Sequence, residues 1–334
     1  MSAFDGIIGG ERLKAALGRQ LAYGRVSHAY LLEGTAGTGK ALYADRLAKA
    51  LVCLAPGEDG SACGVCSSCA LFVAGNNPDV IRVQPDGAKL IGVDEIRERV
   101  NREASVTPYA AARKVFIIRR ADAMTPAAQN ALLKTLEEPP GHAVFILTAR
   151  PGGAVLPTIR SRCQTLNVPP VSDREAARFV SEKTGADYSS ALEAARFARG
   201  GIGAALRILA NERFSEISET VRGALAGLGG ADIVDVYAAA RKLSEYKDSA
   251  EEIVLMALLW YTDLLEFRRI GPERFMDRPG RLGDLSACRL TESQILSGAE
   301  AAAEAGAKIR RGANPALSIE IMLYKMNDER FGKV

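Results

Sequence analysis

The sequence predicts an α/β fold with a largely parallel sheet, followed by an all-helical C-terminal region. Two observations support this prediction. In the first half of the chain, short apolar runs typical of strands alternate with stretches of helical periodicity, and this order favours parallel strands joined by helices. After Val171 the strand pattern does not recur, and the remaining sequence is typical of helices.

Length and composition limit the possible classes of protein. The chain has 334 residues, of which 48% are hydrophobic, so we expect two or three domains, each with its own core. The 43 basic and 40 acidic residues leave a net charge of +3, which argues against a general attraction to nucleic acid or anionic membrane. Any contact with DNA should therefore be local or shared. The N-terminus lacks a basic leader, and no apolar stretch approaches the ~20 residues of a membrane helix, so a soluble cytoplasmic protein is expected.

A glycine-rich loop follows the first predicted strand, "AYLLEG". Gly34, Gly39 and Lys40 fit the phosphate-loop pattern G-x-x-x-x-G-K-[ST] between a strand and a helix, where backbone amides and the lysine can hold phosphate oxygens. Ala41 stands where the pattern has a hydroxyl that binds Mg²⁺. The context favours descent from a nucleotide site, and the alternative is a glycine turn that binds no ligand.

Four of the six cysteines crowd into one short segment just after the helix that follows this loop. They are Cys53, Cys63, Cys66 and Cys69. Four thiolates at this spacing can surround one tetrahedral Zn²⁺, which predicts a closed structural site. An iron–sulfur cluster, a redox disulfide and free thiols remain as alternatives.

The next two strands are predicted at "DVIRVQP" and "RKVFIIRR", with a helix between them that begins near Asp94 as a possible cap. In P-loop ATPases the second of these strands ends in acids that hold Mg²⁺ and activate water. Here it ends in Arg119 and Arg120, which can do neither. Lys40 and Arg119 could form a positive pocket for an anion without a metal, or the arginines could form salt bridges or face a partner.

The remaining elements of the sheet region follow in order. A helix should begin with Thr125 as cap and Pro126 at its first position, and end at Pro139. Strands are expected at "AVFILTA" and "QTLNVPP". The loop "LPTIRSRCQ" between them presents Arg160 and Arg162, which read without context as a solvated pair but could also reach the nucleotide of a neighbouring subunit.

The helical half is predicted to contain two further domains. Ser172 and Glu175 form a capping box after Pro169 and Pro170, and a glycine-rich stretch, "RGGIGAALRIL", joins two helices. A long helix carries an apolar stripe that we interpret as core: Ile253, Met256, Trp260, Leu264 and Phe267. The expected division is 1–170, 171–212 and 213–334.

These motifs together resemble the bacterial DNA polymerase III clamp-loader subunits, the AAA+ family of gamma/tau and delta-prime. The matching features are "HAYLLEG" before the loop, the four-cysteine insertion, "NALLKTLEEPP", and Ser161-Arg162-Cys163. The resemblance covers Ile8 to about Pro169 well and the C-terminal helices only by pattern. It implies an AAA+ domain with a degenerate P-loop and a zinc module at 53–69, a small helical lid domain and an all-α C-terminal collar domain.

The resemblance also implies roles for particular residues. The family's Ser-Arg-Cys arginine acts in trans as a finger, which would be Arg162, and the family's zinc module corresponds to the four cysteines. Four departures from an active gamma/tau subunit fall on one site: Ala41, Arg119, Arg120, and Gly203 in place of a second-sensor arginine. This distribution resembles the delta-prime branch, which does not hydrolyse ATP itself, so we expect no productive Mg-ATP site.

The implied partners are gamma/tau and delta subunits in a hetero-pentamer, with the sliding clamp and primer-template DNA reached through that complex. Two alternatives of other classes remain. One is a working gamma/tau-like ATPase or helicase loader, which Ala41, Arg119 and Arg120 argue against. The other is an independent zinc-containing DNA-binding module, which the near-neutral charge argues against.

Overall fold

A computed structural model describes residues 3–87, 89–228, 231–275 and 279–327. The chain divides into two compact units. Unit 1 comprises residues 1–179 and 198–204, and unit 2 comprises 180–197 and 205–334. The division into three domains expected from the sequence stays a prediction.

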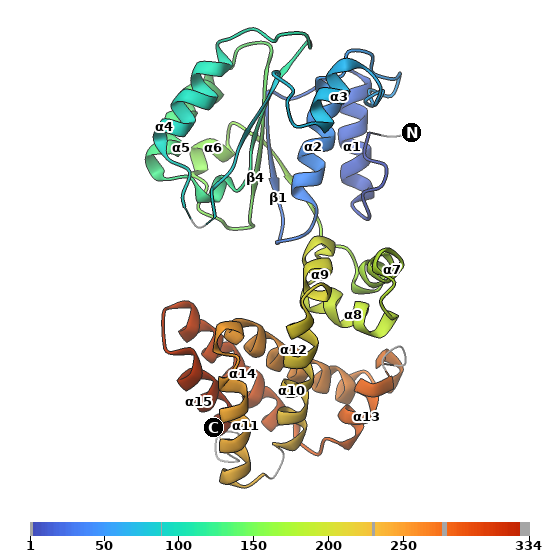
Figure 1. Ribbon diagram of the computed structural model, residues 1–334, viewed down its shortest axis with the longest axis vertical. Helices are drawn as coiled ribbons and strands as arrows, with labels where there is room; N and C mark the ends of the chain where they lie inside the picture. Colours follow the sequence, from blue (N-terminus) through green and yellow to red (C-terminus); the bar gives the residue numbers. More distant parts are fainter. Residues whose placement is uncertain (1–2, 88, 229–230, 276–278, 328–334) are drawn as a thin grey trace. The chain divides into compact units, whose positions relative to one another are not determined.

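Unit 1 is built on a five-stranded parallel sheet with helices on both faces (Figure 1). Its elements in chain order are α1 (Glu11–Ala22), β1 (Ala29–Glu33), α2 (Lys40–Leu51), α3 (Ser67–Val73), β2 (Val80–Val83), α4 (Val93–Ile96), the π-helical turn η1 (Arg97–Arg102), β3 (Lys114–Ile118), the 3₁₀ turn η2 (Ala121–Ala123), α5 (Pro126–Glu137), β4 (Ala143–Ala149), α6 (Pro157–Arg160) and β5 (Gln164–Asn167). The strand order is β2-β3-β4-β1-β5, and every pairing is parallel. The strands β1 and β4 therefore lie inside the sheet, with the glycine loop at the carboxyl end of β1.

The alternation of strand side chains divides the core of unit 1 into two layers. Val115 and Ile117 of β3 pack with the apolar residues of α1 and α2, whereas Phe116 and Ile118 pack with α4, η1 and α5. Because both faces are covered, β3 and β4 are buried along their whole length. This explains the unbroken apolar runs in the sequence and confirms the predicted parallel α/β class.

The helix caps of unit 1 follow the sequence with one correction. Thr125 caps α5, because its hydroxyl accepts a hydrogen bond from the Ala128 amide, and Pro126 is the first helical residue. Ser172 accepts a hydrogen bond from the Glu175 amide at the start of α7 (Asp173–Thr184), as expected. The expectation of Asp94 as a cap was wrong: α4 begins one residue earlier, and Gly92 occupies the cap position without a side-chain bond.

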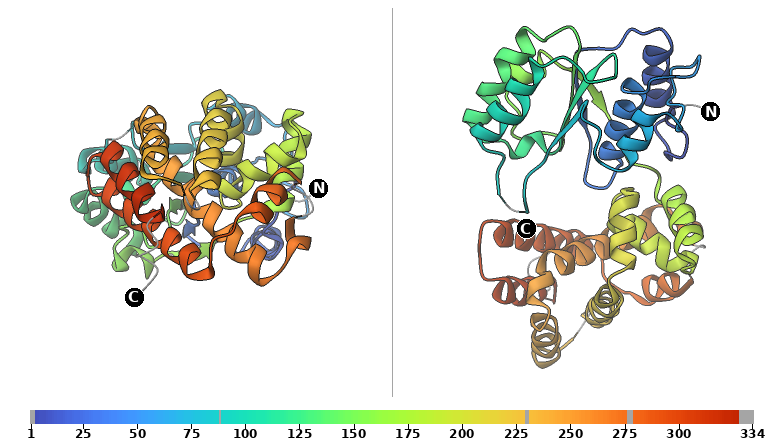
Figure 2. Two further views of the ribbon diagram at one scale, coloured as in Figure 1. Left: turned by 90° about the horizontal axis from the view of Figure 1, so that it is seen from below. Right: turned by 45° about the horizontal axis from the view of Figure 1, so that its top comes forward.

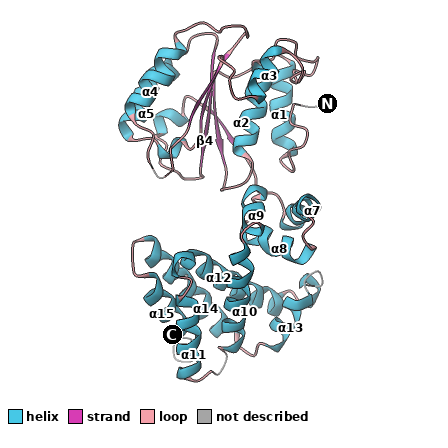
Figure 3. Cartoon of the chain, in the orientation of Figure 1, coloured by secondary structure: helices cyan, strands magenta, loops and turns pink. Residues whose placement is uncertain are grey.

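Unit 2 contains only helices among its described residues (Figure 3). Two helices, α7 and α9 (Ile202–Leu209), pass from one unit into the other along the chain. The others are α8 (Tyr188–Phe197), α10 (Glu212–Gly227), α11 (Ile233–Ser244), η3 (Lys247–Ser249), α12 (Ala250–Arg269), η4 (Pro272–Phe275), α13 (Pro279–Ala287), α14 (Glu292–Arg310) and α15 (Pro315–Asn327). None of the described helices is long and apolar enough to span a membrane.

The core of unit 2 is organised around α12. The predicted apolar stripe is core: Ile253, Met256, Trp260 and Leu264 are buried, and Phe267 packs against them. Figure 2 shows the helices of unit 2 from two further directions. The helices α12 and α14 approach closely at Gly298, where an added Cβ would lie 2.3 Å from Cε1 of Tyr261. Glycine is therefore required at this crossing.

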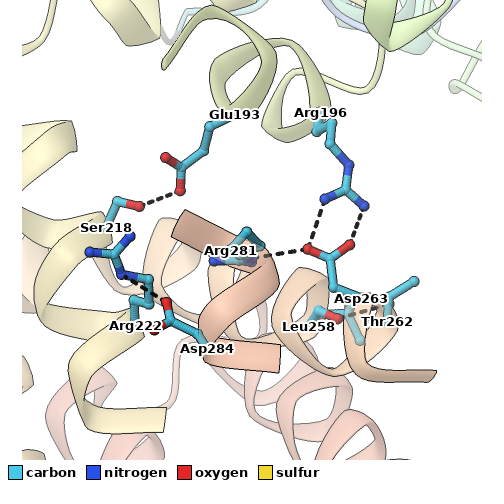
Figure 4. A network of polar contacts seen from close by, with 9 residues as sticks. All are labelled: Glu193, Arg196, Ser218, Arg222, Leu258, Thr262, Asp263, Arg281 and Asp284. Atoms are coloured by element: carbon cyan, nitrogen blue, oxygen red, sulfur yellow. Dashed lines mark hydrogen bonds and ion pairs between the residues drawn. The ribbon is translucent and has the colours of Figure 1, made fainter. Parts of the chain in front are cut away.

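A charged group is buried inside unit 2 (Figure 4). Asp263 on α12 is fully buried and forms ion pairs with Arg196 of α8 and Arg281 of α13. Arg196 Nη1 lies 2.8 Å from Asp263 Oδ2, and Arg281 Nε lies 3.1 Å from the same oxygen. A single carboxylate thus connects α8 and α13 to α12.

Candidate functional site

The glycine loop joins β1 to α2 in the predicted strand–turn–helix arrangement. Gly37 and Gly39 have φ values of 81° and 89°, a left-handed backbone that other residues adopt only with strain. Gly39 is the N-cap of α2, and Lys40 is the first residue of that helix. The backbone geometry that the phosphate-loop pattern requires is therefore present.

The ammonium group of Lys40 is bound by the loop itself. Its Nζ atom donates to the carbonyl oxygens of Gly34 and Thr35, each at 2.6 Å. Burial lowers the pKa of Lys40, while the nearby Asp122 carboxylate acts in the opposite direction. The cation that would contact a terminal phosphate is thus engaged with two protein acceptors.

No hydroxyl stands at the magnesium position of the loop. Ala41 is exposed on the first turn of α2. The preceding hydroxyl, that of Thr38, is buried and donates to the carbonyl of Thr35 at 3.0 Å. Neither residue offers an available hydroxyl for a metal at this point.

A second segment of unit 1, residues 200–204, packs directly against the loop. The amide of Gly203 donates to the carbonyl of Gly37 at 3.3 Å. A Cβ atom on Gly37 would lie 2.8 Å from the Ala204 nitrogen, and one on Gly201 would lie 2.5 Å from the Ala36 oxygen. Glycines at 37 and 201 thus permit backbone-to-backbone contact. At Gly203 the nearest atom would be 3.7 Å away, so no steric need for glycine exists there.

The arginines at the end of β3 share no hydrogen-bond partner with Lys40 among the described residues. Arg119 Nη2 donates to Asp45 Oδ2 of α2 at 2.7 Å, and Arg119 Nη1 contacts Gln84 Oε1 at 3.4 Å. Arg120 is exposed and has a left-handed backbone, with its amide bonded to the Thr148 hydroxyl. For Arg119 the structure contains the salt bridge that was one of the alternatives, and no sequence pattern pointed to its partner Asp45.

The two arginines of the "LPTIRSRCQ" segment have different surroundings. Arg160 forms a two-pronged ion pair with Glu33 at the end of β1, with N–O distances of 2.8 and 2.6 Å. Arg162 contacts Glu137 Oε1 at 2.5 Å and the Thr158 carbonyl at 2.9 Å. The side chain of Glu33 is 14% exposed and that of Glu137 is 46% exposed. The side chains of Arg160 and Arg162 are similarly exposed, 31% and 34%, so the two arginines differ in the burial of their carboxylate partners.

The four cysteines converge on one point, as predicted. The sulfur atoms of Cys53, Cys63, Cys66 and Cys69 all lie within 4.8 Å of one another, with 4.0 Å between Cys53 and Cys66. Sulfurs bound to zinc at ~2.3 Å in a tetrahedron are about 3.8 Å apart. The cluster therefore fits a four-sulfur metal site with little movement of the side chains.

Backbone amides around the cluster favour thiolates. The amides of Leu54 and Cys69 lower the pKa of Cys66 to about 6, and the amides of Val65 and Cys66 lower that of Cys63. Burial raises the pKa of Cys53, and raises that of Cys69 to about 12. A bound cation is what would ionise these two buried thiols, and a metal would thus complete the charge balance of the site.

The segment that contains the glycine loop and the cysteine cluster is similar to proteins of known function. The pattern of the family described as "DNA polymerase III, delta subunit" matches residues 9–172. This segment is similar to the delta-prime and gamma/tau subunits of DNA polymerase III. The family match covers the whole sheet of unit 1, the glycine loop, the cysteine cluster and Arg162.

Relatives from both branches of the family are similar to this chain. The delta-prime subunit of Pseudomonas aeruginosa is 44% identical over 41% of this chain and 42% of its own length. The delta-prime subunit of Escherichia coli is 34% identical over 61% of this chain and 60% of its own length. The gamma/tau subunit of Mycobacterium tuberculosis is 43% identical over 48% of this chain and 28% of its own length. The chain thus matches less than two thirds of each relative.

One solved structure is also similar to this chain. It is a gamma-subunit-related protein of DNA polymerase III from Thermotoga maritima, 20% identical, covering 94% of this chain and 98% of its own, with a TM-score of 0.42. The similarity to these subunits rests on the sequence matches.

Proposed function

We propose that the chain is a delta-prime-like subunit of a DNA polymerase III clamp loader that does not hydrolyse ATP itself. Its Arg162 would complete the ATP site of a neighbouring gamma/tau subunit during loading of the sliding clamp in DNA replication. The relatives named above, from both the delta-prime and gamma/tau branches, support the membership of such a complex.

The single observation that best supports this proposal is the contrast between Lys40 and Arg162. The Lys40 ammonium is bound to two carbonyl oxygens of its own loop, whereas Arg162 lies at the surface against one half-exposed carboxylate. A productive site needs a hydroxyl and carboxylates that hold Mg²⁺, and Ala41 and Arg119 stand at these positions. The chain's own loop thus lacks the groups for hydrolysis, while its edge offers a guanidinium to a partner.

The partner chemistry follows from that guanidinium. An arginine finger places positive charge on the phosphoryl group as it transfers, and the planar fork can bind two oxygens at once. Leaving Glu137 for a nucleotide phosphate would replace one anionic partner by another, so Arg162 would not be left without a counter-charge. We propose gamma/tau as the chain that holds this nucleotide, with delta, the sliding clamp and primer-template DNA as further components of the complex.

The cysteine cluster has a structural part in this proposal. Cys53, Cys63, Cys66 and Cys69 would hold Zn²⁺, which when bound would crosslink the segment between α2 and α3. A four-sulfur site leaves no position open for substrate. The metal would therefore fix the fold of this segment and take no part in ATP hydrolysis.

Reconstitution with gamma/tau and delta subunits tests the role of Arg162. Arg162→Ala should leave assembly intact and reduce DNA-stimulated ATPase several-fold or more, since known fingers contribute about 10³ to 10⁵ in kcat at the site concerned. Arg162→Lys should be intermediate at best, because it keeps the charge and loses the fork. Arg19→Ala, on the exposed face of α1, is the matched control and should behave as wild type. Unchanged ATPase and clamp loading with Arg162→Ala would reject the proposal.

An active ATPase is the second candidate, because the 43% identity to a gamma/tau subunit is as high as the identity to delta-prime. ATP turnover by the isolated chain that requires Mg²⁺ and disappears in Lys40→Ala would establish it. Calorimetry with ADP and ATP, with and without Mg²⁺, separates loss of hydrolysis from loss of binding.

A further inference from the structure

A groove in unit 1 gathers an excess of positive charge. It encloses about 670 Å³, within the range of about 300–1,000 Å³ typical of ligand sites, and lies between α2, α3 and the ends of β2 and β3. Its lining includes five cationic side chains, Arg46, Lys49, Arg82, Arg99 and Arg119, and one carboxylate, Asp45. The lining thus carries a net +4, compared with +3 for the entire chain.

Helix α2 presents one continuous face to this groove. Leu42, Asp45, Arg46 and Lys49 are spaced three and four residues apart, which places them on one side of the helix. Within the described part of the chain, Arg46 and Lys49 have no carboxylate partner. These two cations are therefore available to an anionic ligand.

The remaining arginines are held in place across the floor of the groove. Asp45 lies 2.7 Å from Arg119 Nη2 and 3.9 Å from Arg82 Nε. The guanidinium of Arg82 also lies over the Phe72 ring, 4.7 Å from its centroid. Arg99 donates to the backbone carbonyl of Arg82 at 2.8 Å and pairs with Glu95 at 3.2 Å. Such fixed guanidinium groups lose little conformational entropy when they bind phosphate.

Apolar side chains stand beside these cations. Leu42 is 42% exposed on α2, and Val73 is 74% exposed at the end of α3. Phe72 and Val73 follow directly after the cysteine cluster, since Cys69 is part of the same helix. The cysteine segment therefore forms one wall of the groove.

We propose that this groove binds the phosphodiester backbone of a single nucleic-acid strand. The cations would contact phosphates, and the exposed apolar surface of Leu42 and Val73 would contact unstacked bases, which only a single strand presents. An acidic protein segment with apolar side chains is the competing occupant, and the experiment below includes it as an outcome that overturns the proposal. The choice of nucleic acid as the ligand rests on the proposed function in replication. The binding surface itself is taken from the groove alone.

The test is binding of a fluorescent oligothymidylate to the full chain, measured by anisotropy between about 50 and 200 mM salt. The variant Arg46→Glu/Lys49→Glu should bind at least about tenfold more weakly, and its salt dependence should fall by about 1.4 in slope, the value for two phosphate contacts on a single strand. The matched control is Arg12→Glu/Arg19→Glu, two charge reversals on the exposed face of α1, which should bind as wild type. Circular dichroism and thermal unfolding establish that both variants are folded.

Three outcomes overturn this inference. The first is no binding by wild type at the lowest salt, and the second is an equal loss of binding in the α1 control. The third is competition by polyglutamate as strong as by oligothymidylate, which would assign the groove to an acidic protein. The assay uses the chain alone, so it is independent of the finger. Arg162→Ala should bind the strand normally whether or not it alters ATPase in the reconstituted complex.

Discussion

Lys40 and Arg162 are cations of the same unit, and their side chains end in opposite surroundings. Lys40 lies at the start of α2 with its ammonium between two carbonyl oxygens of the glycine loop. Arg162 lies beyond α6 against Glu137, a surface carboxylate. Charge and motif position alone do not decide whether a cation can meet a ligand, because the acceptors that already surround it set its availability. Lys40 is bound by carbonyl oxygens of its own loop, whereas Arg162 is bound by a half-exposed carboxylate and the Thr158 carbonyl.

Removal of the metal proposed for the cysteine cluster should give the largest effect, and this effect should be confined to the segment around the cluster. Helix α2 runs from Lys40 to Leu51 and leads directly into Cys53. Structural zinc in small modules contributes on the order of 10 kcal/mol of apparent binding energy at neutral pH. We therefore expect chelation, or Cys63→Ser/Cys66→Ser, to abolish hydrogen-exchange protection in α3 and at the end of α2, with residues 157–163 unchanged. Metal analysis that finds iron, or no metal in freshly purified protein, would contradict the zinc assignment.

Alanine at the loop contact should have the next largest effect. Gly37→Ala introduces a side chain at a φ of 81° and within 2.8 Å of the Ala204 nitrogen, and Gly201→Ala places one 2.5 Å from the Ala36 oxygen. Each should lower the free energy of unfolding by about 2–3 kcal/mol, measured by urea denaturation. Gly203→Ala is the control, since it meets nothing closer than 3.7 Å and lies within α9. It should be neutral or stabilising by up to about 1 kcal/mol, and a loss equal to that of Gly201→Ala would refute the proposed packing.

Loss of the Arg160 ion pair and loss of the Arg162 side chain should lower the stability of the protein by different amounts. Glu33→Gln removes the charge that holds Arg160, and should lower the free energy of unfolding by about 1–2 kcal/mol, less than the cost of breaking a fully buried pair. Arg162→Ala should cost below about 0.5 kcal/mol because its partner is half exposed. Equal losses in thermal denaturation would erase the distinction between a structural and an available arginine.

Restoring the loop hydroxyl should have the smallest effect. Ala41→Ser supplies one magnesium ligand but leaves Arg119 paired with Asp45 and the Lys40 ammonium bound to the loop carbonyls. We expect no Mg²⁺-dependent ATP turnover by the isolated variant in a coupled assay. Turnover above wild type would mean that the loop opens more readily than its contacts imply.

The sequence predicted the parts of unit 1 that depend on local pattern. The apolar runs of β3 and β4, the Thr125 cap and the convergence of the four cysteines all follow from periodicity and spacing. The missed features join residues that are distant in sequence. Arg119, at the end of β3, forms an ion pair with Asp45 of α2, and no sequence periodicity relates these two residues.

The sequence predicted which residues form the candidate site, but it did not predict the residues that they contact. Gly34, Gly39 and Lys40 form the expected loop, but its contact with residues 200–204 depends on how the chain returns to unit 1 after α8. Glu33 and Glu137 each stand at the end of an element, and only the fold determines which arginine each one meets. The Ser161-Arg162-Cys163 motif singled out Arg162, but the carboxylate partners of Arg160 and Arg162 could not be predicted from motifs.

The buried triad of unit 2 constrains how this chain can change over evolutionary time. Asp263 neutralises part of the charge of Arg196 and Arg281 at once. Replacement of the aspartate alone leaves two partly buried guanidinium groups without their shared anion, while simultaneous apolar replacement of all three can be nearly neutral. Substitutions at these three positions should therefore be accepted as a group, and divergent homologues should carry either the whole triad or a wholly apolar substitute.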